Sequence, residues 1–113
     1  MSKEEIKKFV EQQFNDNVVK IIKKKNTNKY YVFFNNGRII VNSYLEDIKY
    51  EQMTIIEEKQ YLPYCNLNNI YKLIILYKKK LKNAKNKAFK DFDEWVLNNY
   101  IEDYKILGGK KEV

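Results

Sequence analysis

The groups that usually carry catalysis are scarce in this chain. The sequence contains no histidine, which removes the commonest general base, the Ser-His-Asp triad and histidine-ligated zinc. Its one cysteine, Cys65, cannot build a thiolate cluster, and a half-buried, inert thiol is the favoured interpretation of it. The three glycines form no phosphate-binding loop. We therefore expect no cofactor and no metal-dependent or histidine-based catalytic site.

One enzymatic pattern is nevertheless present. Glu57 and Lys59 form an acid-x-Lys pair, and Asp47 precedes them in the chain. Many nucleases hold Mg²⁺ with two carboxylates and use such a lysine to orient the attacking water. Because 33% of the residues are charged, the same spacing arises easily by chance, and solvated charges at a strand end are the favoured interpretation. A minimal Mg²⁺-dependent nuclease is the third functional hypothesis, and cleavage of plasmid DNA with Mg²⁺ is its test.

The most informative charged segments are rich in lysine. From residue 78 to residue 90, seven of thirteen residues are lysine and none is acidic. A second group lies in the first strand pair. The two groups are Lys78, Lys79, Lys80, Lys82, Lys85, Lys87 and Lys90, and Lys20, Lys23, Lys24, Lys25 and Lys29. Such clusters neutralise phosphates, and counterion release then drives binding. The competing interpretation is solvated surface, with some lysines favoured by a helix C-terminus.

The basic residues also indicate the kind of contact. Only one of the 22, Arg38, is arginine. Lysine suits backbone phosphates, whereas arginine reads guanine edges through two hydrogen bonds, so we expect backbone-dominated binding. Arg38 follows Asn36-Gly37 and is the candidate for a hairpin tip that enters a groove, with Asn35 and Asn36 able to contact bases. Four tyrosines near the lysines are candidates for base stacking, although core-edge positions are favoured for them: Tyr30, Tyr31, Tyr44 and Tyr77.

Length and composition indicate the class of protein. At 113 residues, 44% of them hydrophobic, the chain fits one folded domain, expected over residues 1–109 with a disordered tail at 110–113. The net charge of +7 favours anionic partners, although abundant Lys, Asn, Ile and Tyr is also what an AT-rich coding sequence produces. With a charged N-terminus, one cysteine and no long apolar run, we expect a cytoplasmic protein without membrane contact.

The first half of the chain predicts a helix followed by a sheet. Ser2 and Glu5 match a capping box, and Ile6, Phe9, Val10 and Phe14 form the apolar stripe of a helix that ends at residues 15–17. Strands are expected at residues 18–23, 29–35, 38–44 and 50–59. Asn36-Gly37 is the strongest signal for a two-residue hairpin turn, which would pair Phe34 with Ile39.

That hairpin has two apolar faces, from which we expect a central position in the sheet with both sides covered. Val32, Phe34, Ile39 and Val41 share one face, and Tyr31, Phe33, Ile40 and Tyr44 share the other. After Pro63, Asn66 is a candidate N-cap for a helix over residues 67–81. A last helix is expected over residues 87–106, with an apolar face of Phe89, Phe92, Trp95, Val96 and Tyr100, and Gly108-Gly109 ends it.

These elements predict an α+β fold with the order α-β-β-β-β-α-α. An unbroken helix over residues 67–106 would be roughly 60 Å long and would need a partner, so two helices are favoured. The leading functional hypothesis is a non-enzymatic nucleic-acid-binding protein, DNA before RNA, acting as an accessory or regulator and as a homodimer through the sheet or the last helix. The alternative is a small phage- or plasmid-type protein that binds and inhibits or adapts a larger protein partner.

Overall fold

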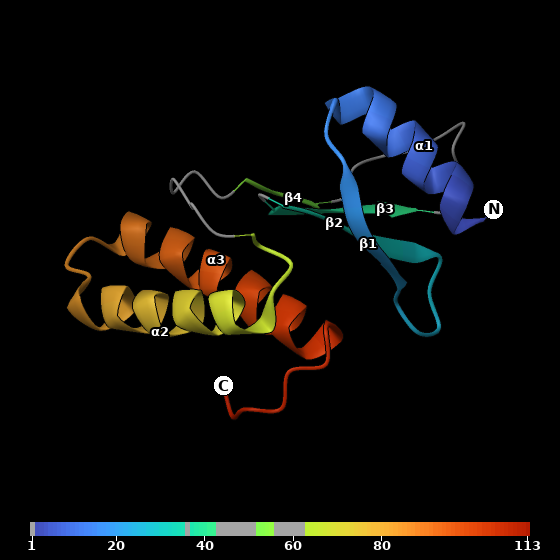
Figure 1. The fold of residues 1–113 in the computed structure, drawn as a ribbon. Helices are drawn as coiled ribbons and strands as arrows, with labels where there is room; N and C mark the ends of the chain where they lie inside the picture. The colour runs from blue at the N-terminus through green and yellow to red at the C-terminus, as the bar shows by residue number, and fades with distance from the viewer. Residues whose placement is uncertain (1, 36, 43–51, 56–62) are drawn as a thin grey trace. The chain divides into compact units, whose positions relative to one another are not determined.

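The computed structural model describes residues 2–35, 37–42, 52–55 and 63–113 (Figure 1). The chain divides into two compact units, Met1–Cys65 and Asn66–Val113, each of which we describe by itself. The first holds an N-terminal helix and an antiparallel sheet, and the second holds two helices. The predicted α+β class is confirmed, in the order of a helix, a three-stranded antiparallel sheet and two helices, as is the break between the two last helices. The single domain over residues 1–109 stays a prediction.

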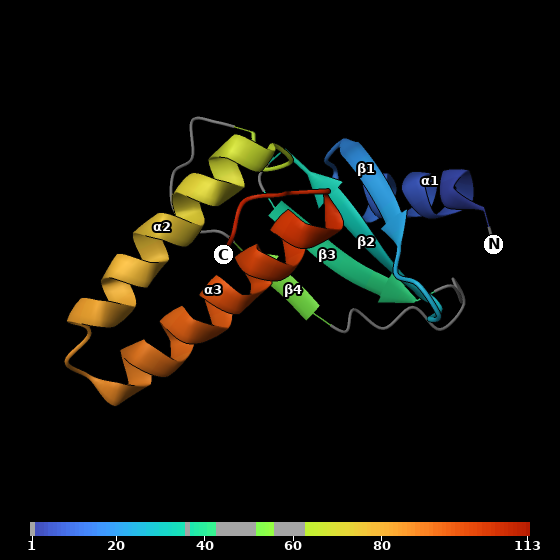
Figure 2. The same ribbon diagram turned by 90° about the horizontal axis from the view of Figure 1, so that it is seen from below.

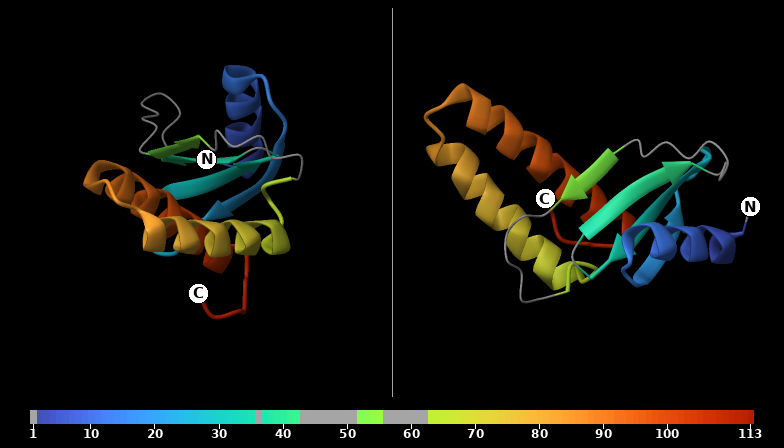
Figure 3. Two further views of the ribbon diagram at one scale, coloured as in Figure 1. Left: turned by 90° about the vertical axis from the view of Figure 1, so that its left-hand side faces the viewer. Right: turned by 90° about the horizontal axis from the view of Figure 1, so that it is seen from above.

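The first unit begins with helix α1, Lys3–Phe14. The hydroxyl oxygen of Ser2 accepts a hydrogen bond from the backbone N–H of Glu5 at 3.2 Å, which satisfies one of the free amides of the first turn. At the other end Asn15 adopts a left-handed conformation with φ of 50°, which asparagine tolerates better than most residues. Figure 3 shows α1 lying on one side of the sheet. The predicted apolar stripe is confirmed, because Ile6 and Val10 are fully buried in the core on that side.

Three strands form an antiparallel sheet in chain order: β1 (Val18–Lys23), β2 (Lys29–Phe34) and β3 (Gly37–Asn42). A short strand, β4 (Gln52–Ile55), pairs with the outer side of β3, which makes β2 and β3 the inner strands. The fourth strand is expected over residues 50–59, of which residues 50–51 and 56–59 lie outside the described part of the chain. The pairing of β1 with β2 and of β2 with β3 follows from their short polar connections, which favour pairing of consecutive strands.

The predicted register of the β2–β3 hairpin is wrong by two residues. Gly37 pairs with Phe34 and belongs to β3, whereas the sequence analysis placed it in the turn and paired Phe34 with Ile39. Asparagine also tolerates positive φ, so local turn preference does not choose between neighbouring two-residue loops in an Asn-Asn-Gly segment.

The predicted faces of the sheet are nevertheless confirmed. A shift of two residues leaves every side chain on its original side, whereas a shift of one would move it to the other. One face joins α1 in a single apolar cluster, to which the sheet contributes Tyr30, Val32, Phe34, Ile39 and Val41. On the opposite face Tyr31, Phe33 and Ile40 are also buried, and the ring of Phe33 stacks on that of Tyr64 at a centroid distance of 6.5 Å.

The second unit is an antiparallel pair of helices, α2 (Leu67–Asn83) and α3 (Lys87–Ile106), which lie side by side in Figures 1 and 2. The side-chain oxygen of Asn66 accepts a hydrogen bond from the N–H of Asn69 at 3.1 Å, which confirms the predicted N-cap of α2. Two aromatic pairs hold the helices together: Tyr77 with Tyr100 in an edge-to-face arrangement at 5.3 Å, and Tyr71 with Tyr104 at 5.8 Å.

The end of the chain folds back on this unit. Gly108 has a φ of 91°, and the N–H of Gly109 donates to the carbonyl of Tyr104 at 2.8 Å, so the predicted glycine stop of α3 is confirmed. The backbone N–H of Lys111 donates to the hydroxyl of Tyr104 at 3.1 Å, and the Lys111 ammonium lies 4.5 Å from the centroid of the Tyr71 ring. These contacts are evidence against disorder of the tail. The expected disorder of residues 110–113 stays a prediction.

Candidate functional site

Lysines gather at the closed end of the α2–α3 hairpin, where residues 84–86 connect the helices. They come from the last turns of α2, from the connection and from the first turn of α3, and all are exposed. We call this set the basic end: Lys78, Lys79, Lys80, Lys82, Lys85, Lys87 and Lys90. The antiparallel turn between the helices brings the lysines of three consecutive segments to one end of the unit.

The helix macrodipole accounts for only part of this charge. Lys80 and Lys82 lie in the last turn of α2, where a positive charge is stabilising. Lys87 and Lys90 lie in the first turn of α3, where a positive charge is unfavourable, and that turn contains no acidic residue. The Asn86 side chain accepts a hydrogen bond from the N–H of Ala88 at 2.9 Å, while the partial positive charge of the helix N-terminus adds to that of the lysines. These charges therefore lower the stability of α3 and raise the affinity of this end of the helix pair for an anion.

Two lysines of the basic end have partners inside their own unit. The Lys78 ammonium donates to the backbone oxygen of Val113 at 3.0 Å, and the Lys80 ammonium lies 4.4 Å from the centroid of the Tyr77 ring. Within the described part of the chain, no carboxylate forms an ion pair with Lys79, Lys82 or Lys85, nor with the two lysines of the first turn of α3. These ammonium groups remain available to an anion from solution.

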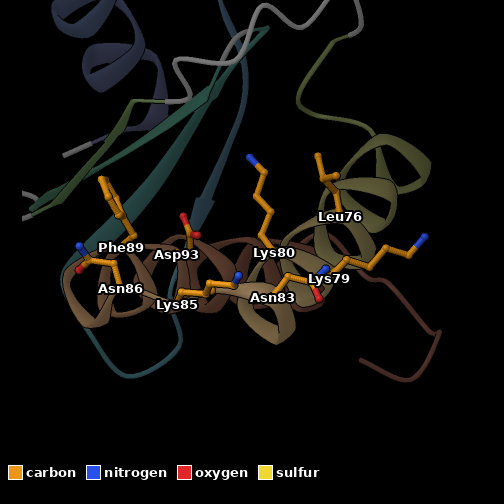
Figure 4. A pocket seen from close by; sticks show the side chains of 9 residues that line it. Leu76, Lys79, Lys80, Asn83, Lys85, Asn86, Phe89 and Asp93 are labelled. Atoms are coloured by element: carbon orange, nitrogen blue, oxygen red, sulfur yellow. The ribbon is translucent and has the colours of Figure 1, made fainter.

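An open hollow of about 530 Å³ lies between α2 and α3 at this end (Figure 4). Three lysines line it, Lys79, Lys80 and Lys85, together with one carboxylate, the half-buried Asp93. In Figure 4 the side chains of Lys80, Asp93 and Phe89 point to the same side. The positive charges outnumber the negative one, so the hollow attracts anions.

Large apolar side chains are exposed on the first half of α3. Phe89 in the hollow is 67% exposed, Phe92 is 57% exposed and Trp95 is 42% exposed. The Phe92 and Trp95 rings contact each other at a centroid distance of 6.2 Å. We call Phe89, Phe92 and Trp95 the aromatic strip. Three exposed aromatic rings on one helix of a small domain indicate a contact surface.

The aromatic strip corrects the sequence analysis, which placed all three residues on the buried face of the last helix. Only Val96 and Tyr100 of that predicted face are buried. Periodicity identifies the face of a helix but not how far along the helix a partner covers it. The available signal was composition, because Phe89 and Phe92 lie in a segment dense in charge, whereas Val96 and Tyr100 follow it.

The lysines of the first strand pair lie in the other unit. Lys20 and Lys23 on β1 and Lys24 and Lys25 after it are exposed, and Lys29 at the start of β2 is half-buried. The two groups of lysines belong to separate units, so we consider the basic end by itself as a binding surface. A joint cationic surface made of both groups stays a prediction.

Arg38 does not lie at an exposed hairpin tip. It pairs with Phe33 inside the sheet, its side chain is only 1% exposed, and its guanidinium carbon lies 5.2 Å from the centroid of the Tyr31 ring. Tyr30, Tyr31 and Tyr77 are buried as well, so their rings are not presented to solvent. The base-reading role of Arg38 stays a prediction that requires this side chain to leave its buried position.

Several residues of the other hypotheses lie outside the described part of the chain. These are Asn36 of the hairpin turn, Tyr44, and the nuclease candidates Asp47, Glu57 and Lys59. Among the residues that are described, no group of three or more cysteine, aspartate or glutamate side chains could hold a metal ion. None of the described helices combines the length and the apolarity needed to cross a membrane.

No protein-family model matches this sequence, and the comparisons with curated proteins and with solved structures found no significant match.

Proposed function

We propose that the protein binds nucleic acid, DNA before RNA, through the basic end of the α2–α3 hairpin, without catalysing a reaction on it. We propose that the full α-β-β-β-β-α-α fold expected from the sequence presents this surface, and that the protein acts as a homodimer. The observation that carries the proposal is the clustering of exposed lysines around the start of α3, where they oppose the helix macrodipole. Charges kept at a site where they cost stability are typical of ligand binding.

Phosphate is the anion that best matches this surface. The lysines are compact charges on flexible stems and are spread over two helices and their connection. Such a surface suits a polymer with regularly spaced charges better than a single small anion, because each contact releases condensed counterions. With one buried arginine, the binding is expected to depend little on base sequence.

Binding of a labelled DNA duplex over a series of salt concentrations tests the proposal. We expect micromolar affinity at low salt and a steep fall in affinity as salt rises, with a logarithmic slope of about −0.9 per phosphate contacted. A variant with Lys82, Lys85 and Lys87 changed to Gln should reduce the magnitude of that slope by roughly 2 to 3.

A matched variant separates a local effect from an effect of net charge. Changing Lys3, Lys7 and Lys8 to Gln removes the same charge from α1 and should leave the slope unchanged. Changing Lys23, Lys24 and Lys25 to Gln then measures what the first strand pair contributes. Absence of binding at low salt would reject the basic end as the binding surface. So would equal effects of the α1 variant and of the variant at Lys82, Lys85 and Lys87.

The second candidate function is binding to a larger protein, as an inhibitor or adaptor. The observation that favours it is the exposed aromatic strip, since Trp and Phe are enriched in protein interfaces. Recovery of a partner from nuclease-treated host lysate that is lost in a Phe92→Ala variant would favour this candidate over the first. The Mg²⁺-dependent nuclease stays a third hypothesis, whose residues lie outside the described part of the chain.

A further inference from the structure

We propose that the aromatic strip and the hollow beside it bind single-stranded nucleic acid by stacking of bases on Phe89, Phe92 and Trp95. This inference depends on the proposed function and specifies its ligand. Three features of the second unit support it: the exposure of the rings, their spacing along α3, and the lysines beside Phe89.

The exposure of the rings is confined to one half of a continuous stripe on α3. Phe89, Phe92, Val96 and Tyr100 follow one another at steps of three or four residues, so they share a face of the helix. Val96 and Tyr100 are buried, and Tyr100 packs against Tyr77 of α2. Towards the closed end the same stripe continues with exposed rings, and Trp95 joins it through its contact with Phe92. The surface is therefore apolar and aromatic where its own unit does not cover it.

The spacing of the rings suits successive bases of a flexible strand. The ring centroids of Phe92 and Trp95 lie 6.2 Å apart. A single strand is not held at the duplex repeat of about 3.4 Å and can adjust its bases to this step. In a duplex the faces of the bases are covered by their neighbours, so stacking on a protein ring requires unstacked bases.

The charges beside Phe89 favour a nucleic acid over an uncharged apolar partner. Lys79, Lys80 and Lys85 line the hollow into which Phe89 projects, and Asp93 is the one carboxylate there. A cationic groove that follows the backbone, with aromatic rings for the bases, is the usual arrangement in proteins that bind single strands without sequence preference. The acidic Asp91 and Glu94 on the same helix would oppose an anionic membrane surface and any phosphate close to them.

Trp95 provides a direct probe, because it is the only tryptophan in the chain. In the free full-length protein its fluorescence should be quenched by acrylamide, as its exposure requires. Titration with an unstructured oligothymidine of about 12 nucleotides should quench it saturably, and a duplex of equal length should bind more weakly and quench it less.

Conservative variants separate stacking from general apolar contact. Phe89→Leu and Phe92→Leu keep apolar side chains but remove the rings, so each should weaken oligothymidine binding by about five- to hundredfold without changing the salt slope. Ile75→Ala removes an exposed apolar side chain that does not line the hollow and should leave affinity unchanged. Both phenylalanines are more than half exposed, so these variants are expected to keep the thermal midpoint of the parent.

Each contrary outcome has a separate meaning. Oligothymidine binding that leaves Trp95 unquenched and is insensitive to both leucine variants overturns the inference, while the lysine-dependent proposal survives. No binding of either nucleic acid at low salt overturns both. A Trp95 that acrylamide does not reach, or that shifts to shorter wavelength only with anionic phosphatidylserine vesicles, shows that another protein surface or a lipid surface covers the strip, and overturns the inference.

Discussion

Lys87 occupies the first position of α3, in the turn whose backbone N–H groups have no acceptor within the helix. A negative side chain there would be stabilising, and a positive one is destabilising. Helix α1 also begins with a lysine, Lys3, but its first turn contains two acidic residues, Glu4 and Glu5, whereas the first turn of α3 contains none. If the proposed nucleic-acid binding is right, these lysines serve the ligand at the expense of helix stability.

A pair of substitutions with opposite signs tests this interpretation. Lys87→Glu should raise the free energy of unfolding by about 0.3 to 1 kcal/mol and lower DNA affinity. Lys82→Glu makes the same change in charge in the last turn of α2, so it should lower the free energy of unfolding by a similar amount and also lower DNA affinity. Urea denaturation measures the stability difference. Equal stability changes in the two variants would contradict a macrodipole effect.

At the scale of elements, the connection of residues 84–86 decides how the basic end is built. The extended backbone of Ala84 ends α2, and Asn86 begins α3 by capping the N–H of Ala88. The segment contains neither glycine nor proline, so the break depends on the cap and on packing between the helices. Without it, Lys85 and Lys87 would lie along one helix rather than around a turn.

Asn86→Ala should therefore lower the free energy of unfolding by about 1 kcal/mol, because it leaves an amide of the first turn without its acceptor. Asn83→Ala is the matched control: it makes the same change in an exposed side chain at the end of α2 and should stay within about 0.5 kcal/mol of the parent. Thermal and urea unfolding measure both. A harmless Asn86→Ala would show that packing of the helices alone maintains the break.

At the scale of the whole molecule, the division into two compact units makes it necessary to test whether they unfold together or separately. Each is shorter than the roughly 70 residues below which one apolar core rarely supplies more than a few kcal/mol. The single domain expected over residues 1–109 therefore predicts one cooperative unfolding transition. Trp95 fluorescence reports on the second unit and hydrogen exchange of the β2 and β3 amides on the first, and their midpoints should coincide. Two separate midpoints would show that the units unfold independently.

The sequence by itself determined the structural features that depend on residues close together in the chain. The caps at Ser2 and Asn66, the stripe of α1 and the division of the sheet into two faces follow from spacing, because side chains repeat every two residues in a strand and about every 3.6 in a helix. Because a break was expected between the last two helices, the sequence also placed the lysines of residues 78–90 at one end of this helix pair.

Only the tertiary structure decided which residue meets which. The pairing of Phe34 with Gly37, the burial of Arg38 over Tyr31 and the exposure of Phe89 and Phe92 depend on how whole strands and helices pair and pack. A periodic pattern states that a residue lies on an apolar face, but burial requires a second surface of matching length. That surface covers the second half of the α3 stripe and leaves its start exposed, because packing is a property of two elements and spacing is a property of one.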